Sequence, residues 1–277
     1  MSIDVVKNVF AFLFGACVGS FLNVCIYRLP KSLSIVRPRS FCPGCNKTIA
    51  GYDNIPLVSF LLLGGKCRRC AKPISIRYPI VELLTAILFL VLYMYFGLSW
   101  DLVKFAFFFS LLIVLSVIDI DYHAVPASLC VLGIVVGLAF TLPASVRTVE
   151  TGVQDIFQIP LIAGLRRLIF GFGFAYLFKF FGDVFIDVYL NWRKKESIEG
   201  ERESLGLGDV DFLGMVSVFM GAQAALLVFF MAPFFALLYS LVALFWKRSH
   251  LIPYLPYLSA ATVVVFFWGK QILGFIF

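Results

Sequence analysis

The sequence predicts an all-α polytopic membrane protein with about eight transmembrane helices and one small polar domain between the first two. Of its 277 residues, 61% are hydrophobic and 17% are aromatic, and the mean hydropathy is +0.98. Soluble domains are about 45–50% apolar, so this composition indicates a membrane protein rather than a soluble globule. Apolar runs long enough to cross a bilayer recur along most of the chain, whereas four of the seven cysteines gather in a single polar segment.

The first apolar run covers residues 8–27 and predicts a helix that stays in the membrane. A cleaved signal peptide is the alternative, but such a peptide begins with basic residues and ends at a small-residue cleavage site. Here Lys7 is the one early base, and the positive charge follows the run instead. We therefore expect a retained helix with its N-terminus outside. The small residues at positions 15, 16, 19 and 20 favour close contact with another helix.

The polar segment after this helix predicts a cytoplasmic loop. Residues 28–77 contain ten Lys and Arg residues and a single acid, Asp53. Cytoplasmic loops of membrane proteins carry such an excess of positive charge. The net charge of +7 therefore reflects orientation in a lipid membrane, and we expect no nucleic-acid partner.

Two CxxC pairs inside this loop predict a metal site. Cys42 and Cys45 form the first pair, Cys67 and Cys70 form the second, and 21 residues separate them. Each CxxC turn directs two thiolates at one ion, so two turns complete a closed tetrahedral site, which is typical of structural Zn²⁺. A redox function is the alternative, but one pair would suffice for it and no thioredoxin-like βαβ pattern surrounds either pair.

Seven further apolar segments follow the loop. Their expected limits are residues 80–97, 102–118, 125–142, 161–190, 210–231, 233–246 and 252–276. Alternation across the membrane places the end of the 102–118 segment and the start of the 210–231 segment on the cytoplasmic side. The basic residues 193–195 and 247–248 agree with this topology.

Two carboxylates occupy matching places at the ends of apolar segments. Asp119 ends one long apolar run, and Asp209 follows Gly206-Leu207-Gly208 and precedes another. An acid at the membrane border is costly unless it is paired or lines a wet cavity, although each acid could also be an interfacial helix cap. Two facing carboxylates tend to share one proton, which leaves one acid and one base. An aspartic protease needs this arrangement to activate water and to protonate the leaving amine.

Other functions remain open for these acids. A transporter or channel could use membrane acids to bind an ion, but the two acids lie at helix ends and no inverted repeat is evident. Asp121 and Asp211 each follow a proposed catalytic aspartate by two residues, and we expect them to be acids facing the interface. Glu82 enters the second helix just after Pro79, where it either caps the helix start or contacts a ligand.

The order of these motifs resembles the type IV prepilin peptidases. Residues 19–30 look like the opening helix of that family and its exit, and residues 74–79 with Glu82 look like the segment after its zinc-binding loop. Asp119, seven residues before Pro126, is similar to the first catalytic aspartate of the family. Residues 206–209 are similar to the GxGD motif that holds the second.

The resemblance implies a bifunctional enzyme of the bacterial inner membrane. Such enzymes remove the basic leader of type IV prepilins or type II secretion pseudopilins, then N-methylate the new N-terminus with S-adenosylmethionine. The implied domains are a first transmembrane helix (1–28), a zinc-binding, methyltransferase-associated domain (29–79) and an aspartic peptidase domain (80–277). The chain departs from the family at Asp211, where a basic residue is usual, and at Ala127, where Asp or Asn is common.

Overall fold

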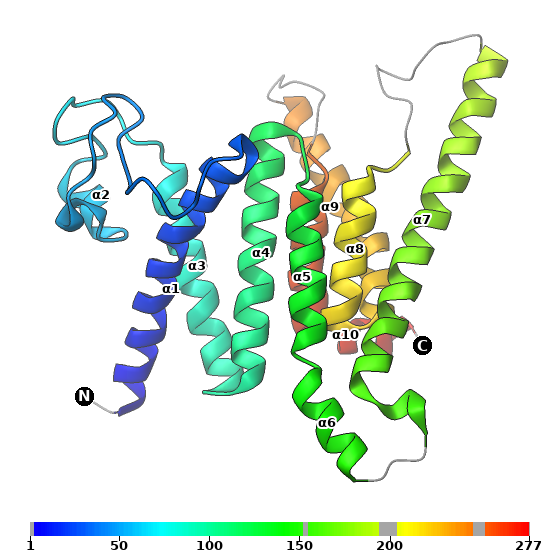
Figure 1. Cartoon of the computed structure of the whole chain (residues 1–277). Coiled ribbons are helices and arrows are strands. Elements are labelled where there is room, and N and C mark those ends of the chain that lie inside the picture. Colours follow the sequence, from blue (N-terminus) through cyan, green and yellow to red (C-terminus); the bar gives the residue numbers. More distant parts are fainter. Residues whose placement is uncertain (1–2, 152–154, 194–203, 246–252, 277) are drawn as a thin grey trace. The chain divides into compact units, whose positions relative to one another are not determined.

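The computed structural model describes residues 3–151, 155–193, 204–245 and 253–276 (Figure 1). Within these residues the chain is helical and contains no strand, as the sequence predicts. Seven of the described helical segments are long and apolar enough to cross a membrane. The protein is therefore a multi-pass membrane protein. It divides into two compact units, Met1–Tyr122 and His123–Phe277.

Three long helices form the first unit: α1 (Ile3–Arg28), α3 (Arg77–Phe96) and α4 (Trp100–Tyr122). The loop between α1 and α3 carries the 3-10 turns η1 (Leu29–Lys31) and η2 (Gly51–Asn54) and the short helix α2 (Val58–Leu62). All three long helices pack against one another, and α1 and α3 make the most extensive contact.

Small residues explain the close approach of α1 and α3. A Cβ atom on Gly15 would lie 2.7 Å from the Cβ of Phe89, and one on Gly19 would lie 2.7 Å from the Cα of Glu82. Side chains at these two positions would push the helices apart, so the small-residue pattern of the first helix serves helix packing. This prediction from the sequence is confirmed.

The second unit contains α5 (Ala127–Ala139), α6 (Leu142–Glu150), η3 (Ile156–Gln158), α7 (Pro160–Arg193), α8 (Leu207–Met220), α9 (Ala222–Phe245) and α10 (Leu255–Ile276). Helix α8 is the buried centre of this unit, because α5, α7, α9 and α10 all contact it. Ten of its fourteen residues are buried. A helix that is apolar on every side is typical of such a position.

The helix break in the sixth apolar segment differs from the expected one. The sequence suggested one segment over 210–231 and another over 233–246, but α8 ends at Met220 and α9 continues through Pro233. Gly221 makes the break with a φ of +98°, which glycine adopts at little cost. At fourteen residues α8 is about 21 Å long, which is shorter than a bilayer core of about 30 Å. The basic residues 194–195 and 247–248 lie outside the described part of the chain.

Candidate active site and metal centre

The four CxxC cysteines come together in the first unit. The sulfur atoms of Cys42, Cys45, Cys67 and Cys70 all lie within 4.8 Å of one another. Those of Cys42 and Cys70 are 3.8 Å apart. Tetrahedral zinc with Zn–S bonds of about 2.3 Å places its sulfur ligands about 3.8 Å apart. The donor set and its spacing therefore fit a four-thiolate metal centre.

The two cysteine pairs sit in matching backbone turns, residues 42–47 and 67–72. In each turn the N–H of the first cysteine donates to the carbonyl five residues later, over 3.0 and 2.9 Å. The N–H four residues later donates back to the first cysteine, over 2.8 and 2.9 Å. Asn46 and Ala71, which donate these return bonds, share a φ of +54°. The same local geometry thus presents two thiols from each turn.

Backbone N–H groups also favour the thiolate form within the cluster. Hydrogen bonds from the N–H groups of Cys70 and Arg69 lower the pKa of the Cys67 thiol to about 6. A thiolate is the form that binds a metal ion. The local backbone therefore prepares this cysteine for ligation.

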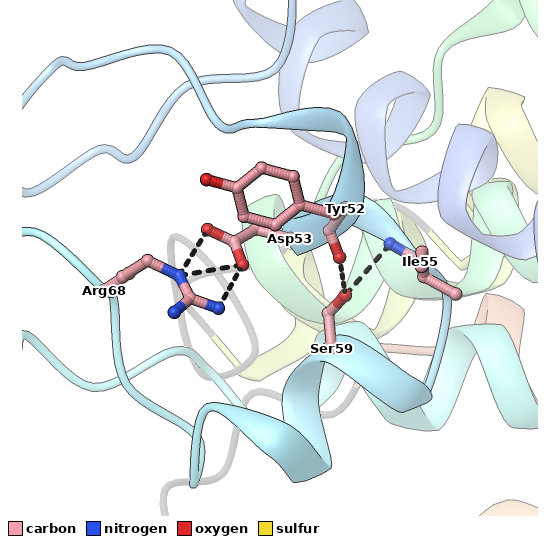
Figure 2. A network of polar contacts seen from close by, with 5 residues as sticks. All are labelled: Tyr52, Asp53, Ile55, Ser59 and Arg68. Atoms are coloured by element: carbon pink, nitrogen blue, oxygen red, sulfur yellow. Dashed lines mark hydrogen bonds and ion pairs between the residues drawn. The ribbon is translucent and has the colours of Figure 1, made fainter.

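A polar network ties the segment between the two turns to the second one (Figure 2). Arg68 donates to both carboxylate oxygens of Asp53, over 2.8 to 3.0 Å, and holds the pKa of that carboxyl below its usual range. The Ser59 hydroxyl donates to the Tyr52 carbonyl and accepts from the Ile55 N–H, over 2.9 and 3.0 Å. These bonds order the loop around the cysteines.

Asp119 lies in the last turn of α4, in the first unit. Only 6% of Asp119 is exposed, which is unusual for an acidic residue. Such burial is expected of a functional acid at a membrane border. Asp121, two residues later, forms an ion pair with Arg77 at the start of α3. Asp121 is an exposed residue, as an acid facing the interface would be, and Arg77 compensates its negative charge.

Asp209 lies in the first turn of α8, in the second unit, and its residue is 8% exposed. Gly206 is the N-cap of that helix, and its carbonyl accepts from the Asp209 N–H over 3.1 Å. The N-terminus of a helix carries a partial positive charge, which stabilises an ionised carboxylate. The helix therefore supports a charged Asp209 despite its burial.

Steric crowding explains why glycine occupies positions 206 and 208, just before Asp209. A Cβ on Gly208 would lie 2.4 Å from the Cβ of Val125, and one on Gly206 would lie 3.3 Å from the Oδ2 of Asp209. A side chain at 208 would displace the start of α8, and one at 206 would crowd the carboxylate. The GxGD pattern thus leaves room for the acid and for its neighbour Val125.

Two charged residues of α7 hold the approach to the GxGD motif. The Asp183 carboxylate accepts from the N–H and the hydroxyl of Ser204, over 2.7 and 2.8 Å. Lys179 donates to the Leu205 carbonyl over 2.8 Å and pairs with Asp183 over 3.0 Å. Asp183 follows Lys179 by four residues on one helix, and this spacing is the sequence signal of such a pair.

The remaining acids also have defined surroundings. Asp211 is half-buried, and the thiol of Cys130 on α5 lies within electrostatic range of both Asp209 and Asp211. Glu82 is not a helix cap, because it is the sixth residue of α3 and accepts from the Leu57 N–H over 2.8 Å.

That the carboxylates of Asp119 and Asp209 face each other stays a prediction, since the two residues belong to different compact units.

Two regions of the chain match models of known protein families. Residues 13–96 match the family model of the bacterial peptidase A24 N-terminal domain. Residues 106–241 match the model of the type IV leader peptidase family. The two matched regions contain the four cysteines and the two buried aspartates, respectively.

Similar proteins carry one shared description. The chain is 40% identical over 218 residues to a prepilin leader peptidase/N-methyltransferase of Myxococcus xanthus, over 79% of this chain and 57% of that relative's length. It is 29% identical to the protein of the same description from Bacillus subtilis, over 95% of each chain. It is 30% identical to the one from Pseudomonas aeruginosa, over 94% of this chain and 90% of the relative. No solved structure matches the chain.

Proposed function

This chain belongs to the type IV leader peptidase family, and we propose that it cleaves prepilin leaders with Asp119 and Asp209 as its catalytic pair. The observation that carries the proposal is the burial of Asp209 at the N-terminus of α8, inside a GxGD motif whose glycines leave it room. Asp119 is the second buried carboxylate at a helix end within the matched region. We propose that the substrates of this enzyme are type IV prepilins and also the pseudopilins of type II secretion.

Helix polarity divides the labour between the two acids. Asp209 lies at the positive end of α8 and acts as the ionised base, whereas Asp119 lies near the carbonyls that end α4 and holds the proton. The water oxygen bonds to the scissile carbonyl carbon while its proton passes to Asp209. Asp119 then protonates the amine nitrogen as the C–N bond breaks. Proton transfer from Asp209 to Asp119 restores the starting state.

The descriptions of the relatives add an N-methyltransferase activity, and we propose that this chain methylates the new N-terminus after cleavage. We propose S-adenosylmethionine as the methyl donor of this chain. When bound, it supplies a methyl carbon that bonds to the amine nitrogen as the C–S electron pair returns to sulfur. The amine loses one proton to solvent.

We propose Zn²⁺ as the ion of the four-cysteine centre. Four thiolates close a tetrahedral site and leave no position for a substrate, so the ion is structural. Residues 29–79 would then form a zinc domain that serves methyl transfer, between the first helix (1–28) and the peptidase domain (80–277). The basic character of the loop favours a cytoplasmic location for it and for both aspartates, in the bacterial inner membrane.

The test is cleavage of a purified type IV prepilin by the full chain in detergent. Asp119→Asn and Asp209→Asn should each abolish turnover at every pH, because neither leaves a second carboxyl to exchange the proton. Asp187→Asn is the matched control, since Asp187 is an exposed acid of α7. Turnover at the wild-type rate in either active-site variant would refute the pair.

Chemical rescue tests the division of roles. Formate is ionised at neutral pH, so it can replace a missing base but not a missing acid. We expect formate to restore part of the cleavage activity of Asp209→Ala and to have little effect on Asp119→Ala. The opposite pattern would exchange the two roles.

A further inference from the structure

We propose that a cavity between α1 and the cysteine-rich loop binds the methyl donor, which rests on the methyl transfer proposed above. The cavity has a volume of about 420 Å³. Small-molecule sites occupy about 300–1,000 Å³, so a nucleoside-sized ligand fits. All of its lining residues lie between Cys17 and Pro56, within the part matched by the N-terminal family model.

A buried arginine holds the first wall of this cavity. Arg28, at the end of α1, is 4% exposed. Its guanidinium donates to the carbonyls of Ser34 and Pro38, over 2.8 Å each. These bonds fold the segment 34–39 back onto α1, where Ile35, Val36, Pro38 and Arg39 line the cavity. A charged side chain buried for this purpose indicates a wall that is built rather than incidental.

A carboxylate holds the second wall. Glu82 of α3 accepts from the Leu57 N–H over 2.8 Å, and the Ser20 hydroxyl lies beside the same carboxyl. Leu57 has a φ of +61°, which is strained for a leucine. Such strain persists only where the surroundings enforce it, and it clusters at ligand sites. Its neighbour Pro56 and the nearby Asn54 line the cavity.

The charges of the cavity match the methyl donor. Arg28 and Arg39 lie on one wall, where they favour a carboxylate, and Glu82 lies behind Ser20, where it favours a cation. S-adenosylmethionine carries both a carboxylate and a cationic sulfonium. Phe21 and Val24 add apolar surface for the nucleoside, and Ser40 and Asn54 add polar groups for its hydroxyls.

An anionic phospholipid is the competing occupant. Two arginines at the end of a membrane helix are also typical of a lipid headgroup site. The carboxylate of Glu82 beside Ser20 argues against that occupant, because it would repel a phosphate. The two ligands therefore become separate arms of one experiment.

The experiment is calorimetric binding of S-adenosylhomocysteine, the unreactive product, to the full zinc-loaded chain in detergent. Val24→Trp fills the cavity and should weaken binding at least about tenfold, which is about 1.4 kcal/mol. Val9→Trp is the matched control, since Val9 is an exposed residue of the same helix outside the cavity, and it should bind like wild type. Zinc content and the thermal midpoint verify that each variant is folded.

A second pair of variants covers the case in which Val24→Trp fails to fold. Arg39→Gln should weaken binding severalfold, whereas Arg37→Gln, outside the cavity on the same segment, should not. Wild-type affinity in both Val24→Trp and Arg39→Gln would overturn the site. The site would also be overturned if Val24→Trp removed the binding of dihexanoyl phosphatidylglycerol but left the binding of S-adenosylhomocysteine unchanged. If wild type neither binds S-adenosylhomocysteine nor methylates a cleaved pilin, the proposed methyl transfer itself is wrong.

Discussion

Arg77 forms an ion pair with Asp121 across 44 residues of sequence. Arg77 is the first residue of α3, where the chain leaves the cysteine-rich loop, and Asp121 lies two residues after Asp119 on α4. The side chains of Arg77 and Asp121 are 25% and 26% exposed, respectively. The pair therefore links the end of the cysteine-rich loop to the helix that carries the first proposed catalytic acid, and it compensates a negative charge beside that acid.

Removing this cation should slow cleavage. Arg77→Gln leaves Asp121 charged and unpaired, and we expect kcat to fall roughly tenfold, which corresponds to about 1.4 kcal/mol in the barrier. Arg37→Gln removes an exposed arginine of the same loop and should leave kcat unchanged. The charge-exchanged variant Arg77→Asp with Asp121→Arg should recover part of the loss. Equal kcat in wild type and Arg77→Gln would show that the pair is irrelevant to cleavage.

The metal centre should contain one zinc per chain. Cys67→Ser removes one of four ligands, so zinc content measured by elemental analysis should fall well below one equivalent. Cys17→Ser, which changes an exposed cysteine outside the cluster, should keep the full complement. Absence of zinc from freshly purified wild type, or a full equivalent in Cys67→Ser, would contradict the assignment.

The Asp53–Arg68 pair should make the cysteine-rich loop sensitive to acid. Because Arg68 lowers the pKa of Asp53, the pair stabilises the fold above the ordinary carboxyl pKa of about 4, and this stabilisation is lost as pH falls through the lowered value. Asp53→Asn should therefore increase hydrogen exchange in residues 52–68 at neutral pH, and its difference from wild type should vanish once the pH falls below the lowered pKa of Asp53. Arg69→Gln, next to the pair, is the control. A difference that grows on acidification would reverse the sign of this linkage.

Gly208→Ala should disturb the start of α8. The added Cβ would lie 2.4 Å from the Cβ of Val125, and such overpacking costs about 1–3 kcal/mol. We expect a lower thermal midpoint and slower cleavage, because Asp209 is the next residue. Combining Gly208→Ala with Val125→Gly removes the clash and should restore both quantities in part. Failure of the double variant to improve on the single one would mean that the Val125 contact is not the cause.

Several features of the fold and the site were predictable from sequence. The membrane class follows from composition, and the cysteine turns follow from local spacing, since each turn needs only a few consecutive residues. The helix break at Gly221 was not predictable in this way. Apart from Asp211, residues 210–233 carry no charge on either side of that glycine, so hydropathy shows no boundary. Pro233 was the more conspicuous break, although the membrane helix accommodates it.

The sequence by itself determined that this protein is helical, lies in a membrane, clusters four cysteines and places Asp119 and Asp209 at helix ends. Those properties depend on composition and on neighbours along the chain. Only the tertiary structure decided that Arg77 meets Asp121, that Glu82 meets Leu57 and that Gly208 meets Val125. Helix periodicity shows which face of a segment is apolar, but the partner that covers it is set by packing between residues far apart in the chain.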